Sequence, residues 1–447
     1  MGQLFGTDGV RGIANTELTC DLAFKLGQAA VVFLGKTLVV GKDTRLSGDM
    51  LESALAAGVM SMGGTVLLAG VIPTPGVAFL TRELHGDGGI VISASHNPPE
   101  YNGIKLFDAR GFKLSDALEE KAETFILGGG TPVADLPFGE ALGVAIPVED
   151  ACGLYIDHVV KSVRDQGIDL EGLHIALDTG HGASALTSKE ALRRLGAQVT
   201  AINDDFTGLD INVGCGSTCL TPLQELVGEV GADVGIAHDG DADRVMFVGP
   251  GGLEIDGDMI EAVCALDMLE RGVLKDSLVA TTVMCNLGFV HAMRKAGIEV
   301  VQTKVGDRYV LEAMLEKGCV LGGEQSGHLI MLDYNSTGDG LLVAAQFLAA
   351  CKRQGKTVEE AASVMARVPQ VLINVKDVDK AALPTNEALK AAVAAAEEEM
   401  GSDGRVLIRP SGTEPLVRVM VESLDPEQAA RIANRLVEVV KEELQRP

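Results

Sequence analysis

The chain carries an acidic loop in which Asp239, Asp241 and Asp243 alternate with Gly and Ala directly after the apolar run Val-Gly-Ile-Ala-His. In an extended loop alternate side chains point the same way, so this spacing directs three carboxylates toward one point. Carboxylate oxygens are the hard ligands that Mg²⁺ prefers. Because three like charges so close together are unfavourable without a cation, we predict a magnesium site. A solvated acidic turn is the alternative.

Known cation-binding and phosphate-handling motifs differ from this sequence at defined positions. A calcium-binding EF-hand requires Gly and Glu at positions where this chain has Arg244 and Pro250. A phosphatase of the haloacid dehalogenase type also places an Asp-x-Asp pair after a strand, but the small hydroxyl residue expected after that pair is absent. Both Gly-Lys-Thr tripeptides lack the first glycine of a P-loop, which argues against a P-loop nucleotidase.

A serine loop, Ser93-Ala-Ser95-His96-Asn-Pro-Pro, follows the apolar run Gly-Ile-Val-Ile. A hydroxyl at a rigid strand-to-loop transition can act as a nucleophile or carry a phosphoryl group. Lys105 follows ten residues after Ser95 and reaches the same pocket if the chain folds back. The Gly-x-Ser-x-Gly pattern is absent at Ser95 and at Ser326, which weakens the case for an acyl-transfer hydrolase. An ordinary turn remains the alternative.

Two further loops combine groups suited to a phosphosugar. Near the C-terminus, Arg409-Pro-Ser411-Gly412-Thr413-Glu-Pro offers a guanidinium, two hydroxyls and an open backbone, with Arg418 as a second cation. This composition favours an anion cradle over a plain hairpin turn.

The other loop is Gly-Gly-Glu324-Gln325-Ser326-Gly-His328, which presents a carboxylate, an amide, a hydroxyl and an imidazole. Vicinal sugar hydroxyls require mixed donors and acceptors of this kind. A Gly-rich turn with a packed histidine is the alternative.

Short β-branched runs that end in such loops alternate with helical stretches, which is typical of α/β domains with parallel sheets. The runs lie at residues 37–41, 65–70, 89–95, 174–182, 198–203, 233–244, 277–284, 298–306 and 319–327. After residue 367 the expected order is helix, strand, strand and helix. The last helix has Ile432, Leu436 and Val440 on one face.

These patterns predict an α/β fold: three related α/β domains with mixed, largely parallel sheets plus a small C-terminal α+β domain. The expected domain ranges are 1–150, 151–250, 251–366 and 367–447. The serine, acidic and sugar-type loops fall in the first, second and third domains, and the anion cradle falls in the fourth.

Composition limits the partners. The 37 basic and 63 acidic residues give a formal net charge of −26, so the field of the protein repels nucleic acid and anionic membranes. No uncharged apolar run is long enough to span a bilayer, and no targeting segment is recognisable, so we expect a cytoplasmic protein. The eight cysteines form no Cys-x-x-Cys pair, which favours reduced thiols over disulfides or zinc.

The four loops stand in a fixed order, one to each expected domain, and together they closely resemble the α-D-phosphohexomutase superfamily over nearly the whole chain. The opening Phe-Gly-Thr-Asp-Gly-Val-Arg-Gly, the segment Val-Gly-Asp-Arg-Tyr-Val (305–310) and Gln325, where the hexose-phosphate mutases commonly have Met, resemble the bacterial phosphoglucosamine mutase branch. Ser93 stands where members of the family often have Thr.

The resemblance implies an enzyme that interconverts glucosamine 6-phosphate and glucosamine 1-phosphate on the way to UDP-N-acetylglucosamine, through a phosphoserine and a glucosamine 1,6-bisphosphate intermediate. It also implies residue roles. One Mg²⁺ per subunit is held by the three aspartates and a phosphoserine oxygen of Ser95, with Arg244 as a further cation. His96 and Lys105 are the candidates for proton transfer. The expected substrate-binding residues are Glu324, Ser326, His328, Arg409, Ser411, Gly412, Thr413 and Arg418.

Three alternative functions can be weighed against this one. A phosphomannomutase or phosphoglucomutase differs only in the C2 substituent of its sugar, which no residue pattern defines. A metal-dependent sugar phosphatase would use Ser95 or Asp239 as a transient phosphoryl carrier. A non-catalytic sugar-phosphate sensor would lack the nucleophile or the metal ligands, and this chain has both. We expect a small phosphosugar as the partner, without nucleic acid or membrane, and leave a homodimer open.

Overall fold

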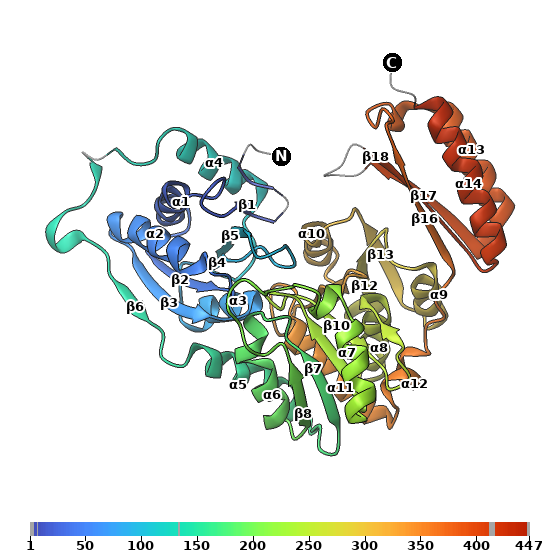
Figure 1. Cartoon of the computed structure of the whole chain (residues 1–447), viewed down its shortest axis with the longest axis horizontal. Helices are drawn as coiled ribbons and strands as arrows, with labels where there is room; N and C mark the ends of the chain where they lie inside the picture. The colour runs from blue at the N-terminus through green and yellow to red at the C-terminus, as the bar shows by residue number, and fades with distance from the viewer. Residues whose placement is uncertain (1–3, 7, 133–134, 411–415, 445–447) are drawn as a thin grey trace. The chain divides into compact units, whose positions relative to one another are not determined.

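The computed structural model describes residues 4–6, 8–132, 135–410 and 416–444. The chain forms two compact units (Figure 1). The first comprises Met1–Thr282 and Glu299–Val364, and the second comprises Val283–Ile298 and Met365–Pro447. Three successive sheets belong to the first unit and a smaller sheet belongs to the second.

The first sheet has the strand order β1-β5-β4-β2-β3-β6. Strands β2, β3, β4 and β6 are parallel, whereas β5 runs antiparallel to both β4 and β1. The strands are β1 (Val10–Ile13), β2 (Thr37–Lys42), β3 (Thr65–Val71), β4 (Gly88–Ile92), β5 (Tyr101–Asp108) and β6 (Ala145–Pro147). The helices are α1 (Cys20–Phe33), α2 (Gly48–Ser61), α3 (Thr74–Glu83) and α4 (Asp116–Leu127).

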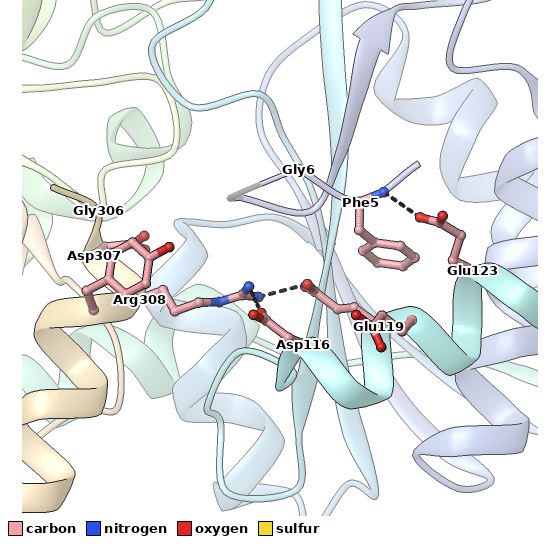
Figure 2. A pocket seen from close by; sticks show the side chains of 10 residues that line it. Phe5, Gly6, Asp116, Glu119, Glu123, Gly306, Asp307 and Arg308 are labelled. Atoms are coloured by element: carbon pink, nitrogen blue, oxygen red, sulfur yellow. Dashed lines mark hydrogen bonds and ion pairs between the residues drawn. The ribbon is translucent and has the colours of Figure 1, made fainter. Parts of the chain in front are cut away.

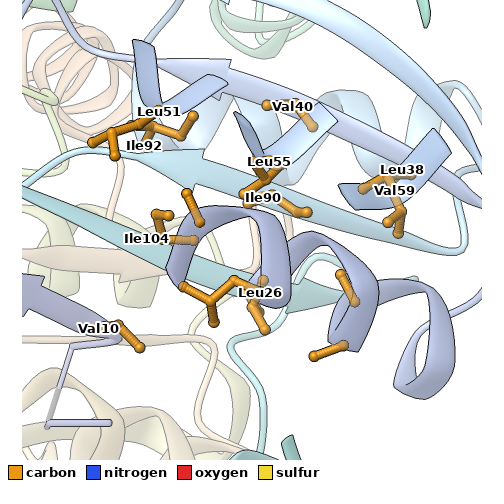
Figure 3. Packing of buried hydrophobic residues seen from close by; sticks show 14 of the residues in the cluster. Val10, Leu26, Leu38, Val40, Leu51, Leu55, Val59, Ile90, Ile92 and Ile104 are labelled. Carbon is orange, nitrogen blue, oxygen red and sulfur yellow. The ribbon is translucent and has the colours of Figure 1, made fainter. Parts of the chain in front are cut away.

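Alternation along these strands explains how the sheet is covered on both faces. Leu38, Val40, Ile90, Ile92 and Ile104 are fully buried in one cluster with residues of α1 and α2 (Figure 3). On the opposite face, Val77 of α3 lies against Gly41 of β2 and Gly89 of β4. Helices α1 and α2 approach closely because Gly27 has no side chain: a Cβ there would lie 2.2 Å from the carbonyl oxygen of Leu55.

The second sheet has the order β11-β10-β9-β7-β8, in which β7, β8 and β9 are parallel and β10 and β11 are antiparallel additions. Its strands are β7 (His174–Asp178), β8 (Gln198–Ile202), β9 (Val234–His238), β10 (Val245–Val248) and β11 (Glu254–Ile255). Helices α5 (Ala151–Arg164), α6 (Ser188–Arg194) and α7 (Thr221–Val230) accompany it. The acidic loop is the connection between β9 and β10.

The third sheet has the order β13-β12-β14-β15, with β12 parallel to both β13 and β14 and with β15 antiparallel to β14. Its strands are β12 (Leu278–Thr282), β13 (Glu299–Thr303), β14 (Leu321–Gly323) and β15 (Leu329–Met331). The helices are α8 (Gly257–Glu270), α10 (Asp307–Lys317), α11 (Gly340–Gln354) and α12 (Val358–Ala362).

The second unit contains an antiparallel sheet of order β16-β18-β17. It consists of β16 (Gln370–Lys376), β17 (Gly404–Pro410) and β18 (Leu416–Ser423), with helices α9 (Leu287–Lys295), α13 (Glu387–Met400) and α14 (Pro426–Glu443). Ile432, Leu436 and Val440 of α14 are fully buried, as the spacing predicts. The three mixed, largely parallel α/β sheets and the small C-terminal α+β part confirm the predicted fold class. The element order predicted after residue 367 is wrong in one respect, because strand β16 precedes α13 and pairs with β18.

Two properties of the described residues bear on the exclusions drawn from composition. No disulfide joins any of the eight cysteines, all of which lie within the described residues, and five of them are buried. No described helix is long and apolar enough to cross a bilayer.

The site loops of the first unit each follow the carboxyl end of a parallel strand, which is where α/β sheets collect their ligand-binding residues.

Candidate active site

The serine loop and the acidic loop meet, although they are separated by 144 residues along the chain. Ser95 follows the end of β4, and its Oγ donates a hydrogen bond of 2.6 Å to Oδ2 of Asp239, which follows the end of β9. Both side chains are buried. Ser95 also has a φ of +51°, a left-handed conformation that is uncommon for a residue other than glycine and marks a position held by its surroundings.

The three aspartates converge as their spacing predicts. One carboxylate oxygen from each of Asp239, Asp241 and Asp243 lies within 4.8 Å of the others, and all three residues are buried. Oδ2 of Asp241 accepts hydrogen bonds from Thr74 Oγ1 at 2.7 Å and from Lys105 Nζ at 2.9 Å. The Oδ1 atoms of Asp241 and Asp243 have no hydrogen-bond partner within the described part of the chain. This set of hard oxygens, two of them unsatisfied, fits a divalent cation.

The pKa shifts of Asp239 and Asp243 also indicate a functional site. Burial, together with the charges of Asp243 and Asp241, raises the pKa of Asp239 to about 8. Burial also acts to raise the pKa of Asp243, but the nearby cations His328, Lys105 and Arg244 outweigh it and hold that pKa well below its usual range. Crowded carboxylates with such opposed pKa shifts are typical of functional sites.

Two candidates for proton transfer differ in their charge. Strand β5 returns alongside β4 and places Lys105, which is fully buried, with its Nζ 2.9 Å from Asp241 Oδ2 and 3.1 Å from Asp8 Oδ2. Burial opposes its charge, but the aspartates raise its pKa and keep it protonated. Nδ1 of His96 lies 3.4 Å from Ser95 Oγ. Burial and the neighbouring Arg244 and Arg11 lower the pKa of His96 to about 4, so it is neutral at pH 7.

The predicted site residues of the sugar-type loop after β14 differ in their exposure. Ser326 is exposed, whereas Glu324 is half-buried and its Oε1 accepts a hydrogen bond of 3.1 Å from the backbone N–H of Gly306. His328 is buried, with its Nδ1 3.5 Å from Asp243 Oδ2. Burial disfavours its charge, yet Asp243 raises the pKa of His328. The loop therefore reaches the acidic loop through its histidine.

In the second unit, Arg409 of β17 and Arg418 of β18 are direct partners in the antiparallel register. Directly opposed side chains lie on the same face of a sheet, so two half-buried guanidinium groups are neighbours there. Burial and the charge of Arg418 lower the pKa of Arg409. The remaining residues predicted for this cradle, Ser411, Gly412 and Thr413, lie outside the described residues.

Several residues that contact the site were not singled out from the sequence. Lys113 forms ion pairs with Asp8 and with Asp307, and Nε2 of His328 lies 3.8 Å from Asp307 Oδ2. Asp8 also faces Lys105, so alternating charges connect the first sheet to the sugar-type loop. Both aspartates lie in segments that carry the family resemblance, but residue type alone does not reveal that they share a lysine.

Beside this chain of charges lies a pocket of about 260 Å³ (Figure 2). The start of the chain, α4 and the start of α10 line it, with Phe5, Asp116, Glu119 and Arg308 among the lining residues. Arg308 forms ion pairs with Asp116 and, at 2.8 Å, with Glu119 (Figure 2). These contacts hold the start of α10, and with it the residues that adjoin the sugar-type loop, against the first sheet's α4.

Comparison with known proteins assigns the family. Four consecutive ranges match the domains of the phosphoglucomutase/phosphomannomutase family: residues 2–130 match alpha/beta/alpha domain I, 154–252 domain II, 256–368 domain III and 372–439 the C-terminal domain. A phosphoglucosamine mutase of Clostridium novyi (strain NT) is 50% identical over 453 residues, which cover 99% of each chain. The chain belongs to the phosphoglucosamine mutase family.

Solved structures agree with this assignment at the level of the fold. A phosphoglucomutase/phosphomannomutase family protein from Burkholderia thailandensis superposes with a TM-score of 0.82 at 24% identity, covering 98% of both chains. The N-acetylphosphoglucosamine mutase of Aspergillus fumigatus, solved with GlcNAc-6P and magnesium, gives a TM-score of 0.70 at 16% identity, covering 99% of this chain and 96% of that one. The predicted resemblance to the α-D-phosphohexomutases is confirmed, and the phosphoglucosamine mutases are isomerases of that superfamily.

Proposed function

We propose that this protein interconverts glucosamine 6-phosphate and glucosamine 1-phosphate, with Ser95 as the phosphoryl carrier. The observation that carries the proposal is the buried hydrogen bond of 2.6 Å from Ser95 Oγ to Asp239 within the aspartate triad. A serine that only served a turn would not need three carboxylates beside it. A phosphoserine brings a further charge of about −1.5 to −2, so this position requires a cation.

Mg²⁺ is the cation that suits the donors. Asp239, Asp241 and Asp243 would hold it together with an oxygen of the phosphorylated Ser95. The unsatisfied Oδ1 atoms of Asp241 and Asp243 support this role. When bound, the ion supplies charge neutralisation and polarisation of the phosphoryl oxygens. Arg244, whose Nε lies 3.8 Å from Asp243 Oδ1, adds a second positive charge at the same place.

Each half-reaction moves one phosphoryl group. The free hydroxyl oxygen of the sugar phosphate attacks the phosphorus on Ser95, the bond from phosphorus to Ser95 Oγ breaks, and glucosamine 1,6-bisphosphate forms. Neutral His96 is the candidate acceptor of the hydroxyl proton, and Lys105, which is held protonated, is the candidate donor to the serine oxygen. After the intermediate has reoriented, its other phosphate returns to Ser95 by the reverse step.

Binding of the rest of the substrate falls to the other two loops. Glu324 and Ser326 offer an acceptor and a hydroxyl for the sugar, and His328 orients their loop against Asp243. Arg409 and Arg418, with Ser411, Gly412 and Thr413, bind the phosphate that is not transferred. The neighbouring pair of guanidinium groups supports this assignment, because paired arginines are suited to a doubly charged phosphate.

A comparison of rates on glucosamine, glucose and mannose 6-phosphates tests the function, and Ser95→Ala tests the carrier. We expect the highest kcat/KM on glucosamine 6-phosphate and almost no activity in Ser95→Ala. Ser326→Ala is the matched control: it should weaken sugar binding while the protein still shows the added mass of a phosphate. A preference for mannose or glucose phosphate would favour the other mutases. Release of inorganic phosphate without isomerisation would indicate a phosphatase.

A further inference from the structure

The backbone of the serine loop is held by a buried arginine that the proposed function does not use. Arg45 follows the end of β2, and its side chain is fully buried. All five of its side-chain N–H groups have acceptors. Nε donates to Asp43 Oδ2, while Nη1 and Nη2 donate to four backbone carbonyls, those of Pro98, Tyr101, Ser95 and Asn97. An arginine fork that is saturated in this way fixes both the position and the orientation of the loop.

A second side chain, from the loop that precedes α7, binds two of the same carbonyls. Nδ2 of Asn212 donates to the carbonyl oxygen of Ser95 at 2.9 Å and to that of Asn97 at 3.2 Å. Arg45 Nη2 donates to these two oxygens at 2.9 and 2.7 Å. Each carbonyl therefore accepts from both sides. Carbonyl oxygens only accept, so the amide of Asn212 must present its NH₂ group to them.

Asn212 also adjoins the acidic loop. A Cβ at Gly240 would lie 2.9 Å from Asn212 Nδ2, so the absence of a side chain at Gly240 lets the amide lie between the two loops. A third tie holds the nitrogen side of the nucleophile: Ser93 Oγ accepts from the N–H of Ser95 at 2.9 Å and donates to Asp43 Oδ2 at 2.6 Å. A threonine hydroxyl could make the same bonds, which explains why Ser93 is a tolerable departure from the family pattern.

We propose that Arg45 and Asn212 form a two-sided clamp that sets the position of Ser95 for phosphoryl transfer, and that both are positioning residues. This inference rests on the proposed role of Ser95. The clamp holds Ser95 at a φ of +51°, a left-handed conformation that is strained for a residue other than glycine. Arg45 acts from the first sheet and Asn212 from the second, so the aim of Ser95 Oγ toward Asp239 depends on both.

The consequence is a loss of rate rather than of substrate affinity. A displacement of about 1 Å of a reacting group can reduce the rate on the order of 100-fold, even when the mutated residue does not touch the substrate. Neither Arg45 nor Asn212 is assigned to the sugar or to its phosphates. Weakening the clamp should therefore lower kcat and leave KM near the wild-type value.

The test uses Arg45→Lys, Asn212→Gly and the double variant in the full-length protein. Lysine keeps the buried charge but loses the fork, and glycine removes the amide while tolerating the φ of +62° at position 212. We expect each single variant to lower kcat on glucosamine 6-phosphate by about 10- to 100-fold. The double variant should lose less than the product of the two single losses, because both donors act on the same two oxygens.

Thr44→Val is the matched control. Thr44 Oγ1 donates to the carbonyl oxygen of His181 at 2.6 Å, so this variant removes a bond from the loop that carries Arg45 to the loop after β7 without touching the serine loop. It should lower the melting temperature and leave kcat near wild type. Equal losses of kcat in Thr44→Val, a rise in KM at constant kcat, or wild-type kcat in Asn212→Gly would each overturn the clamp. Activity in Ser95→Ala would instead overturn the proposed carrier, so the two failures are distinguishable.

Discussion

Lys113 gives a prediction whose magnitude follows directly from its surroundings. Its side chain is only 11% exposed, and it forms ion pairs with Asp8 and Asp307, whose side chains are 20% and 18% exposed. Lys113→Met removes the shared cation and leaves two largely buried carboxylates without it. Asp8 keeps Arg11 and Lys105, and Asp307 keeps His328 nearby, so we expect the loss at the lower end of the about 3–5 kcal/mol that breaking a buried pair costs. At about 1.4 °C per kcal/mol for a unit of this size, the melting temperature should fall by about 4 °C.

Far-UV circular dichroism is the suitable assay, because the chain contains no tryptophan to report by fluorescence. Lys317→Met provides a matched control, since Lys317 is exposed and pairs only with the exposed Glu316 in the described structure. It should change stability by less than about 0.5 kcal/mol. Adding Asp307→Asn to Lys113→Met should restore part of the loss. An unchanged melting temperature in Lys113→Met, or a double variant destabilised by the sum of the single effects, would refute the charge-sharing argument.

Three other predictions concern the metal, the distal phosphate and the thiols. Asp241→Asn removes a hard ligand and should lower Mg²⁺-dependent turnover by about 100-fold or more, while the circular dichroism spectrum is retained. Near-wild-type turnover would exclude the acidic loop as the metal site. Arg409→Ala should lower kcat/KM by about 10- to 150-fold, which corresponds to the loss of charge-assisted hydrogen bonds worth roughly 1.5–3 kcal/mol. Arg431 is an exposed arginine of the same unit, so Arg431→Ala should have little effect on kcat/KM. Burial raises the pKa of the Cys351 thiol to about 12, so this thiol should react slowly with iodoacetamide at pH 8. Mass spectrometry should find Cys20 modified well before Cys351, and early modification of Cys351 would contradict its burial.

Much of the architecture could be predicted because it depends on short-range patterns. The strand-and-helix alternation, the apolar face of α14 and the convergence of Asp239, Asp241 and Asp243 all follow from the periodicity of side chains along one segment. The antiparallel additions to the parallel sheets, such as β5 and β10, carry no signal that distinguishes them from loops before the partner strand is known. The domain ranges, and the roles of individual site residues, remain predictions from the sequence.

The supporting residues could not be predicted, because their function depends on partners far away in the chain. Arg45 lies 50 residues from the Ser95 carbonyl that it binds, and Asn212 lies 117 residues from it. Their residue types are ordinary for loops, and only the folded backbone shows that both donate to the same oxygens. One signal was available: Asp43 and Arg45 follow the end of β2, a parallel strand next to β4, and so share the sheet edge that carries Ser95.

The central claim is that Ser95 passes its phosphoryl group to the sugar and takes another one back. The most direct measurement is the intact mass of the enzyme during a single turnover. Phosphorylated enzyme is mixed with a substoichiometric amount of glucosamine 6-phosphate, and the reaction is quenched at successive times. We predict that the phosphate mass leaves the protein as glucosamine 1,6-bisphosphate appears, and that it returns as glucosamine 1-phosphate forms. Formation of glucosamine 1-phosphate by a protein that never carries phosphate on Ser95 would contradict the account.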